Sequence, residues 1–181
     1  MIIDIFSYKI YKTKLTFKYK KELINIINNI SGENEMQVWN KNVTNGKIFD
    51  FIENDEKFEY NGKNIINILS SEIEKKLSLF SKSINLNKEL LISNFWCVSY
   101  QENQKCIPHT HSSSPEYLFS GIYNLSFDKN SHCGTTYYND KSLKKSITPF
   151  CEENDLFIYP ANVYHGYGGS NSEKKKNSYA I

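Results

Sequence analysis

The chain has 181 residues, of which 39% are hydrophobic and 14% are aromatic, and this is enough apolar material for one compact core. Its formal net charge is only +2, and its lysines are spread along the sequence instead of forming the concentrated basic surface that binds nucleic-acid phosphates. We therefore expect a single domain over residues 1–181 and no nucleic acid among its partners.

The cysteines and the apolar runs bear on the cellular compartment. Cys97, Cys106, Cys133 and Cys151 show no C-x-x-C spacing, and no charged start followed by an apolar stretch marks a secretory signal. The pattern predicts reduced thiols in a cytoplasmic protein, without an extracellular disulfide framework. The longest apolar runs are too short to span a bilayer, so we expect no membrane partner. The sequence leaves a homodimer open.

The first half of the chain predicts extended structure followed by two helices. Residues 1–17 alternate apolar or aromatic side chains with lysine and threonine, as a strand does. Apolar residues then recur at helical spacing over residues 18–30 and again over residues 64–83. Between the helices, residues 31–60 are polar and give only weak signals. Two amphipathic helices of this kind usually cover one face of a sheet.

From residue 91 the apolar period changes to two, which is typical of strands. In Leu91–Tyr100 this alternation places Trp96, Val98 and Tyr100 on one face. The further predicted strands are Phe119–Phe127, Thr135–Tyr138, Ile147–Cys151, Leu156–Tyr159 and Lys174–Ile181. Many short strands after two helices predict an α+β domain, in which residues 1–90 support an antiparallel barrel or sandwich formed by residues 91–181.

Three of the four histidines form one pattern. His109 and His111 are two residues apart, so their side chains point the same way if this segment is a strand, and His165 follows a second predicted strand. A barrel can bring such strand ends together. Three imidazoles can hold one metal ion and leave coordination positions open, and they suit iron, zinc, copper and nickel alike. The sequence therefore predicts a metal site.

Other interpretations of these residues are simpler. An isolated H-x-H is more often an ordinary loop feature, and only the third histidine favours the metal site. Glu116 could add a carboxylate as a fourth ligand, but a solvated loop residue is the simpler interpretation of this side chain. His132 lies beside Cys133 in a polar loop, and we do not expect it to be functional.

Longer motifs accompany the histidines. They are Ile5-Phe6-Ser7-Tyr8 at the start, Phe95-Trp96 before the H-x-H, Ser120-Gly121-Ile122-Tyr123-Asn124-Leu125 after it, and Asn154-Asp155-Leu156-Phe157-Ile158-Tyr159-Pro160 before His165 and a basic-x-Ser strand. In this combination the chain resembles the 2-oxoglutarate and Fe(II)-dependent dioxygenases, in particular a branch found in bacteria and phages. The resemblance implies a double-stranded β-helix, or jelly roll, buttressed by N-terminal helices.

The resemblance implies that His109, His111 and His165 bind Fe(II). In most of the superfamily the position of His111 holds Asp or Glu, whereas the H-x-H form resembles the usual form of this branch. The iron site of this chain is therefore expected to have one negative charge fewer, which weakens metal retention relative to a site with a carboxylate.

The resemblance also implies a site for 2-oxoglutarate. The family places a basic residue about ten positions after the last histidine. Lys176 fits best because Ser178 follows on the same face of the strand, and Lys174 and Lys175 are the fallbacks. The chain contains no arginine, so the anchor is a single ammonium group and not a bidentate guanidinium. Two further residues are implied near the cosubstrate: Tyr100 and Ser120.

The implied activity is that of a dioxygenase, an oxidoreductase that uses Fe(II), 2-oxoglutarate and O₂ to hydroxylate a small molecule or a peptide with release of succinate and CO₂. Halogenation suits the site less well, because His111 fills the position that a halide needs. Two alternatives stay open: a cupin-type dioxygenase or isomerase that uses three histidines without 2-oxoglutarate, and a metal-binding or sugar-binding barrel without turnover. The motifs do not specify the prime substrate, because one fold supports many reactions.

Overall fold

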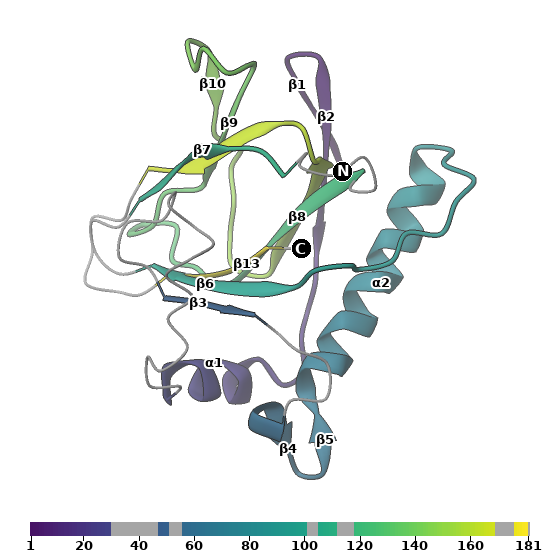
Figure 1. Cartoon of the computed structure of the whole chain (residues 1–181), viewed down its shortest axis with the longest axis vertical. Coiled ribbons are helices and arrows are strands. Elements are labelled where there is room, and N and C mark those ends of the chain that lie inside the picture. Colours follow the sequence, from purple (N-terminus) through teal and green to yellow (C-terminus); the bar gives the residue numbers. More distant parts are fainter. Residues whose placement is uncertain (30–46, 51–55, 101–104, 112–117, 169–175, 181) are drawn as a thin grey trace.

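The computed structural model describes residues 1–29, 47–50, 56–100, 105–111, 118–168 and 176–180. In this part of the chain the helices are α1 (Lys20–Asn29), η2 (Glu56–Phe58, a 3-10 turn) and α2 (Ile65–Ser83). The strands are β1 (Ile2–Ile5), β2 (Tyr8–Lys14), β3 (Lys47–Asp50), β4 (Glu59–Tyr60), β5 (Lys63–Asn64), β6 (Trp96–Tyr100), β7 (Cys106–His109), β8 (Phe119–Ser126), β9 (Thr135–Tyr138), β10 (Ser146–Ile147), β11 (Asp155–Pro160), β12 (Tyr164–Tyr167) and β13 (Lys176–Ala180). Most of the regular structure is therefore β-sheet (Figure 1).

Two antiparallel sheets carry the fold. The larger sheet has the strand order β1-β2-β11-β8-β13-β6-β3, and the smaller sheet has the order β10-β9-β12-β7. From β6 to β9 successive strands alternate between the two sheets, and from β10 to β13 they alternate again. Consecutive strands of this region therefore cross from one sheet to the other instead of forming local hairpins within one sheet, except at β9 and β10.

The larger sheet is covered on both faces. On its outer face, Leu23 of α1 and Leu69 and Ile73 of α2 share one core with Tyr123 of β8 and Leu156 of β11. Figure 1 shows both helices outside the two facing sheets. On its inner face the larger sheet packs against the smaller one, so the two sheets enclose a second core.

The strands of the larger sheet alternate between these two cores, as the pleat requires. In β11, Leu156 and Ile158 face the helices, whereas Phe157 and Tyr159 face the smaller sheet. In β6, the inner residues are Trp96, Val98 and Tyr100. The prediction that these three share a face is confirmed.

Both predicted helices are present, and they cover one face of a sheet as expected. Helix α2 begins after Asn64, whose side-chain oxygen accepts hydrogen bonds from the backbone N–H groups of Ile66 at 3.0 Å and Asn67 at 3.1 Å. Such a cap satisfies N–H groups that have no partner within the helix. The apolar residues that predict this helix are buried along one stripe: Ile66, Leu69, Ile73, Leu77 and Phe80.

The strands differ from the prediction mainly in their bounds. The extended start is a hairpin of β1 and β2, with Phe6 at the turn in a left-handed conformation at a φ of 54°. Of the predicted strand Ile147–Cys151 only Ile147 lies in a strand, paired in β10 together with Ser146; Pro149 has no N–H to donate to a ladder. Strands β7 and β12 are not predicted by hydrophobic alternation, because they are only four residues long and carry histidines.

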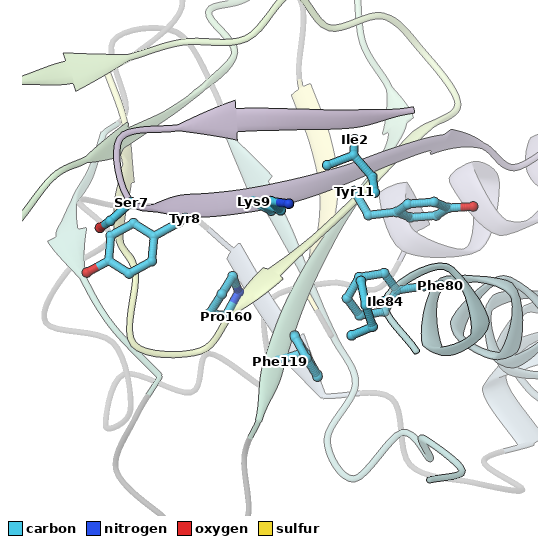
Figure 2. A pocket seen from close by; sticks show the side chains of 9 residues that line it. All are labelled: Ile2, Ser7, Tyr8, Lys9, Tyr11, Phe80, Ile84, Phe119 and Pro160. Carbon is cyan, nitrogen blue, oxygen red and sulfur yellow. The ribbon is translucent and has the colours of Figure 1, made fainter. Parts of the chain in front are cut away.

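A pocket of about 230 Å³ lies between the β1–β2 hairpin and the end of α2 (Figure 2). Its lining residues are Ile2, Ser7, Tyr8, Lys9, Tyr11, Phe80, Ile84, Phe119 and Pro160. Of these, Phe80 and Phe119 belong to the helix side of the larger sheet. No histidine lines this pocket, so it is separate from the metal site predicted from the sequence.

Two general expectations can be compared with the structure. Across the residues that the structure describes, no helix combines the length and the apolar composition needed to cross a membrane. In the described part of the chain the four cysteines form no disulfide.

Candidate metal centre

Three imidazoles meet between the two sheets. His109 ends β7, and His165 lies directly opposite it in the β12–β7 ladder. His111 follows β7, where its backbone N–H donates to the carbonyl of Ala161 at 2.9 Å. One ring nitrogen from each histidine lies within 4.8 Å of the others, and the Nε2 atoms of His111 and His165 are 3.2 Å apart. Two metal–nitrogen bonds of about 2.1 Å at right angles place their nitrogens about 3 Å apart, so this spacing suits one shared ion.

The secondary structure of the site differs from the sequence prediction. The spacing predicts His109 and His111 on one strand and His165 beyond another. In the structure His111 lies beyond the end of β7, and His165 lies inside β12. The sequence prediction assumes that two strand ends meet. In the structure, the pairing of β7 with β12 brings the histidines together.

Backbone carbonyls fix the orientation of two of the rings. The Nδ1 atom of His165 is 3.0 Å from the carbonyl oxygen of Val163, and that of His109 is 2.9 Å from the carbonyl oxygen of Ile107. A carbonyl oxygen only accepts, so each ring donates from Nδ1 and keeps the lone pair of Nε2 free. This is the arrangement in which a histidine binds a metal ion through Nε2.

All three histidines favour the neutral form that binds metal. Burial lowers the pKa of His109 below its usual 6.5. Burial, together with the nearby His109, lowers the pKa of His111 to about 4. Burial also lowers the pKa of His165 well below 6.5, and both neighbouring histidines add to the effect. At neutral pH the cluster is therefore a set of three uncharged donors, as metal coordination requires.

We expect the metal-stripped protein to become more stable as the pH rises from about 4 to about 6.5. The histidine pKa is 6.5 in the unfolded chain and about 4 for folded His111, so the unfolded state binds more protons between these values. The free energy of unfolding then rises with pH, by at most about 1.4 kcal/mol per pH unit for each histidine. Urea denaturation in EDTA at several pH values measures this slope, and an H111N variant should show a shallower one. Equal slopes in parent and variant would contradict the prediction.

Aromatic rings surround the histidines. The ring of Trp96 lies 5.5 Å from that of His111, and the rings of Tyr159 and Tyr137 lie 5.0 and 6.5 Å from that of His165. Burial raises the pKa of both tyrosines well above 10, so their hydroxyls stay protonated. The sequence alone does not predict that Tyr159 lies beside the histidines. Every residue of its strand except the last is buried, so the hydrophobic pattern does not show which residues face the smaller sheet.

Tyr100 and Ser120, which are predicted to lie near the cosubstrate, are on the inner face of the larger sheet. Tyr100 is 6% exposed, and its ring lies 4.5 Å from that of Tyr167. Ser120 is also buried and lies opposite Tyr159 in the β8–β11 ladder. In the backbone register, Lys176 is paired with Tyr100, and Ser178 with Val98. Lys174, Lys175 and Glu116 lie outside the described residues.

His132 lies apart from the cluster, as expected. It is 7% exposed, its ring packs 5.6 Å from that of Phe127, and its Nδ1 accepts a hydrogen bond from the backbone N–H of Asp128 at 2.9 Å. These contacts give it a structural role in the loop after β8.

No protein-family model matches the chain, and no curated protein is similar to it in sequence. Solved structures share its fold. A prolyl-4-hydroxylase of Pseudomonas putida superposes with a TM-score of 0.67 and 9% identity, over 96% of this chain and 91% of that one. A viral collagen prolyl hydroxylase of Paramecium bursaria Chlorella virus-1, solved as a 2OG complex, gives 0.60 and 14%, over 94% and 93%.

A third similar structure is a prolyl hydroxylase from Trichoplax adhaerens in complex with a peptide fragment of the hypoxia inducible factor oxygen degradation domain. It gives a TM-score of 0.64 at 15% identity, over 94% of this chain and 81% of that one. Identities this low establish a common fold and no more. The chain therefore has the fold of structures solved as prolyl hydroxylases.

Proposed function

We propose that this protein is an Fe(II)- and 2-oxoglutarate-dependent dioxygenase whose Fe(II) is bound by His109, His111 and His165. The observation that carries the proposal is the convergence of these imidazoles between the two sheets, in a chain with the fold of the prolyl hydroxylases. The strand order supports a double-stranded β-helix formed by residues 91–181, with residues 1–90 as its support, in one domain. We also propose that the chain belongs to the bacterial and phage branch with an H-x-H motif.

The cosubstrate is proposed to bind beside Tyr100. Lys176 supplies the positive charge for the distal carboxylate of 2-oxoglutarate, and its register opposite Tyr100 supports this role, because Tyr100 lies on the inner face of the larger sheet. Ser178, two residues further along β13, and Ser120 on β8 add hydroxyl groups.

When bound, Fe(II) and 2-oxoglutarate would supply the oxidation: 2-oxoglutarate would be converted to succinate and CO₂, one oxygen atom of O₂ entering the succinate and the other the substrate hydroxyl. The chain's own residues hold and shield this site. The carbonyls of Ile107 and Val163 keep two histidine rings in the orientation that presents Nε2. The rings of Trp96 and Tyr159 pack against the histidines and exclude water from that side.

The proposed prime substrate is a small molecule or a peptide. The peptide complex of the Trichoplax prolyl hydroxylase supports this class, because a structure of this fold was solved with a peptide bound. Hydroxylation is the proposed reaction, since His111 would fill the position that a halide needs. The lack of C-x-x-C spacing among the four cysteines supports the proposed location in the reducing cytoplasm.

The proposal is tested by 2-oxoglutarate binding and turnover. We expect the Mn(II)-loaded protein to bind 2-oxoglutarate in anaerobic calorimetry, and the Fe(II)-loaded protein to form succinate when screened with amino acids, peptides and small metabolites. A K176A variant should bind 2-oxoglutarate about 10- to 100-fold more weakly, as expected for loss of a hydrogen bond to a charged group. The exposed Lys141 provides the matched control, and K141A should bind as the parent does. A metal-loaded protein that binds no 2-oxoglutarate would favour the cupin-type or the non-catalytic alternative.

A further inference from the structure

Two buried tyrosine hydroxyls on the inner side of the sheets have no hydrogen-bond partner in the described part of the chain. Tyr137 of β9 is 1% exposed and Tyr159 of β11 is fully buried. Leaving a buried hydroxyl unpaired costs about 1–3 kcal/mol, so native proteins rarely do so without a reason. An unpaired hydroxyl near a proposed ligand site is therefore a candidate for contact with the ligand.

The two tyrosines form one wall of the metal centre. Their rings pack edge to face at 5.1 Å, and Tyr137 lies opposite His165 in the β9–β12 ladder. Tyr159 lies opposite Ser120 in the β8–β11 ladder, and its ring lies 5.0 Å from that of His165. Tyr137 and Tyr159 thus lie beside His165, and Ser120 lies on the same inner face of the larger sheet as Tyr159.

The neighbouring strand contains a tyrosine on the opposite face. Tyr123 of β8 is also fully buried, but it belongs to the helix-side core, and its hydroxyl donates to the carbonyl of Leu15 at 3.0 Å. The helix-side hydroxyl is therefore satisfied within the chain, whereas the two inner hydroxyls are not. All three residues are buried tyrosines, so whether the hydroxyl has a hydrogen-bond partner depends on the face of the sheet and not on the residue type.

We propose that Tyr137 and Tyr159 donate hydrogen bonds to the distal carboxylate of 2-oxoglutarate. This inference rests on the function proposed above. A carboxylate has about four lone-pair positions, and a lysine ammonium is a point charge that does not fill them in the paired geometry of a guanidinium. In a chain without arginine, two protonated hydroxyls supply the directional donors that an arginine fork would otherwise provide.

The test replaces each hydroxyl by hydrogen. In Mn(II)-loaded protein, we expect Y137F and Y159F each to weaken 2-oxoglutarate binding about 10-fold, and the double variant about 100-fold, in anaerobic calorimetry. Metal stoichiometry and thermal stability without 2-oxoglutarate should stay at or above the parent's values, because phenylalanine removes an unpaired polar group. Y123F is the matched control: it should lose stability and keep full affinity for 2-oxoglutarate.

A second ligand separates the distal carboxylate from the rest of the site. 2-Oxobutyrate has the keto and 1-carboxylate groups of 2-oxoglutarate but no distal carboxylate, so its affinity should be the same for the parent and for both variants. Equal 2-oxoglutarate affinity in the parent and the double variant would overturn the inference and leave the proposed function standing. A parent that binds metal but neither 2-oxo acid would overturn the proposed function, and the inference with it.

Discussion

An H165A variant is expected to lose stoichiometric metal binding and with it the 2-oxoglutarate-dependent activity. His165 is 4% exposed, its Nδ1 is held by the carbonyl of Val163, and its Nε2 lies 3.2 Å from that of His111. Loss of groups that only orient a ligand already reduces metal affinity 10- to 100-fold, so loss of the ligand itself should exceed about 100-fold. Metal content after dialysis and the visible spectrum of the Co(II) form measure this change.

The fourth histidine provides the control. His132 is also buried, but it lies outside the histidine cluster. Its Nδ1 accepts a hydrogen bond from the backbone N–H of Asp128. H132A should lose stability and keep one metal ion per chain. Full metal occupancy in H165A, or equal losses of metal in both variants, would show that the cluster is not the metal site.

Variants of His111 show whether this residue is a ligand. H111A should release metal nearly as readily as H165A. H111D should retain it better than H111A and at least as well as the parent, because a carboxylate adds the negative charge that three imidazoles lack. If H111A binds metal like the parent, only His109 and His165 are ligands, and the 3.2 Å between the Nε2 atoms of His111 and His165 does not reflect a shared ion.

The helices and the inner face of β6 could be predicted from the sequence because their periods are long and regular. The stripe from Ile66 to Phe80 and the alternation through Trp96, Val98 and Tyr100 both appear in the structure. In contrast, β7 and β12 have four residues each, too few for a period to appear, and each holds a histidine where an apolar residue would mark a buried face.

The histidines of the candidate site could be selected from the sequence, but its walls could not. H-x-H and a distant histidine are visible as letters, whereas the pairing of His165 with His109 depends on a ladder between strands far apart in the chain. Tyr159 shows the same limit. Its strand is buried on both faces, so alternation cannot tell the side that faces the helices from the side that faces the metal centre.

A D155N variant is expected to lose about 3–5 kcal/mol of unfolding free energy, the cost of leaving a buried charge without its partner. Asp155 of β11 is fully buried, and its carboxylate lies 2.9 Å from the Nζ atoms of both Lys12 and Lys14 of β2. Lys12 is only 11% exposed and lies over the ring of Phe157 at 5.5 Å, so it cannot turn to solvent without exposing this core. Urea denaturation measures the loss.

Two comparisons separate the buried pair from surface charge. E152Q removes the charge of Glu152, an exposed partner of Lys14; the side chains are 41% and 52% exposed, respectively. This change should lower the free energy of unfolding by less than about 1 kcal/mol. K12M added to D155N should recover much of the loss, because it replaces the unpaired ammonium by an apolar side chain that suits the ring of Phe157. A loss of unfolding free energy below about 1 kcal/mol in D155N would mean that the ion pairs of Asp155 do not stabilise the contact between β2 and β11. Metal affinity of the folded D155N protein should equal the parent's, since this ion pair joins β2 to β11 within the larger sheet and shares no residue with the histidine cluster.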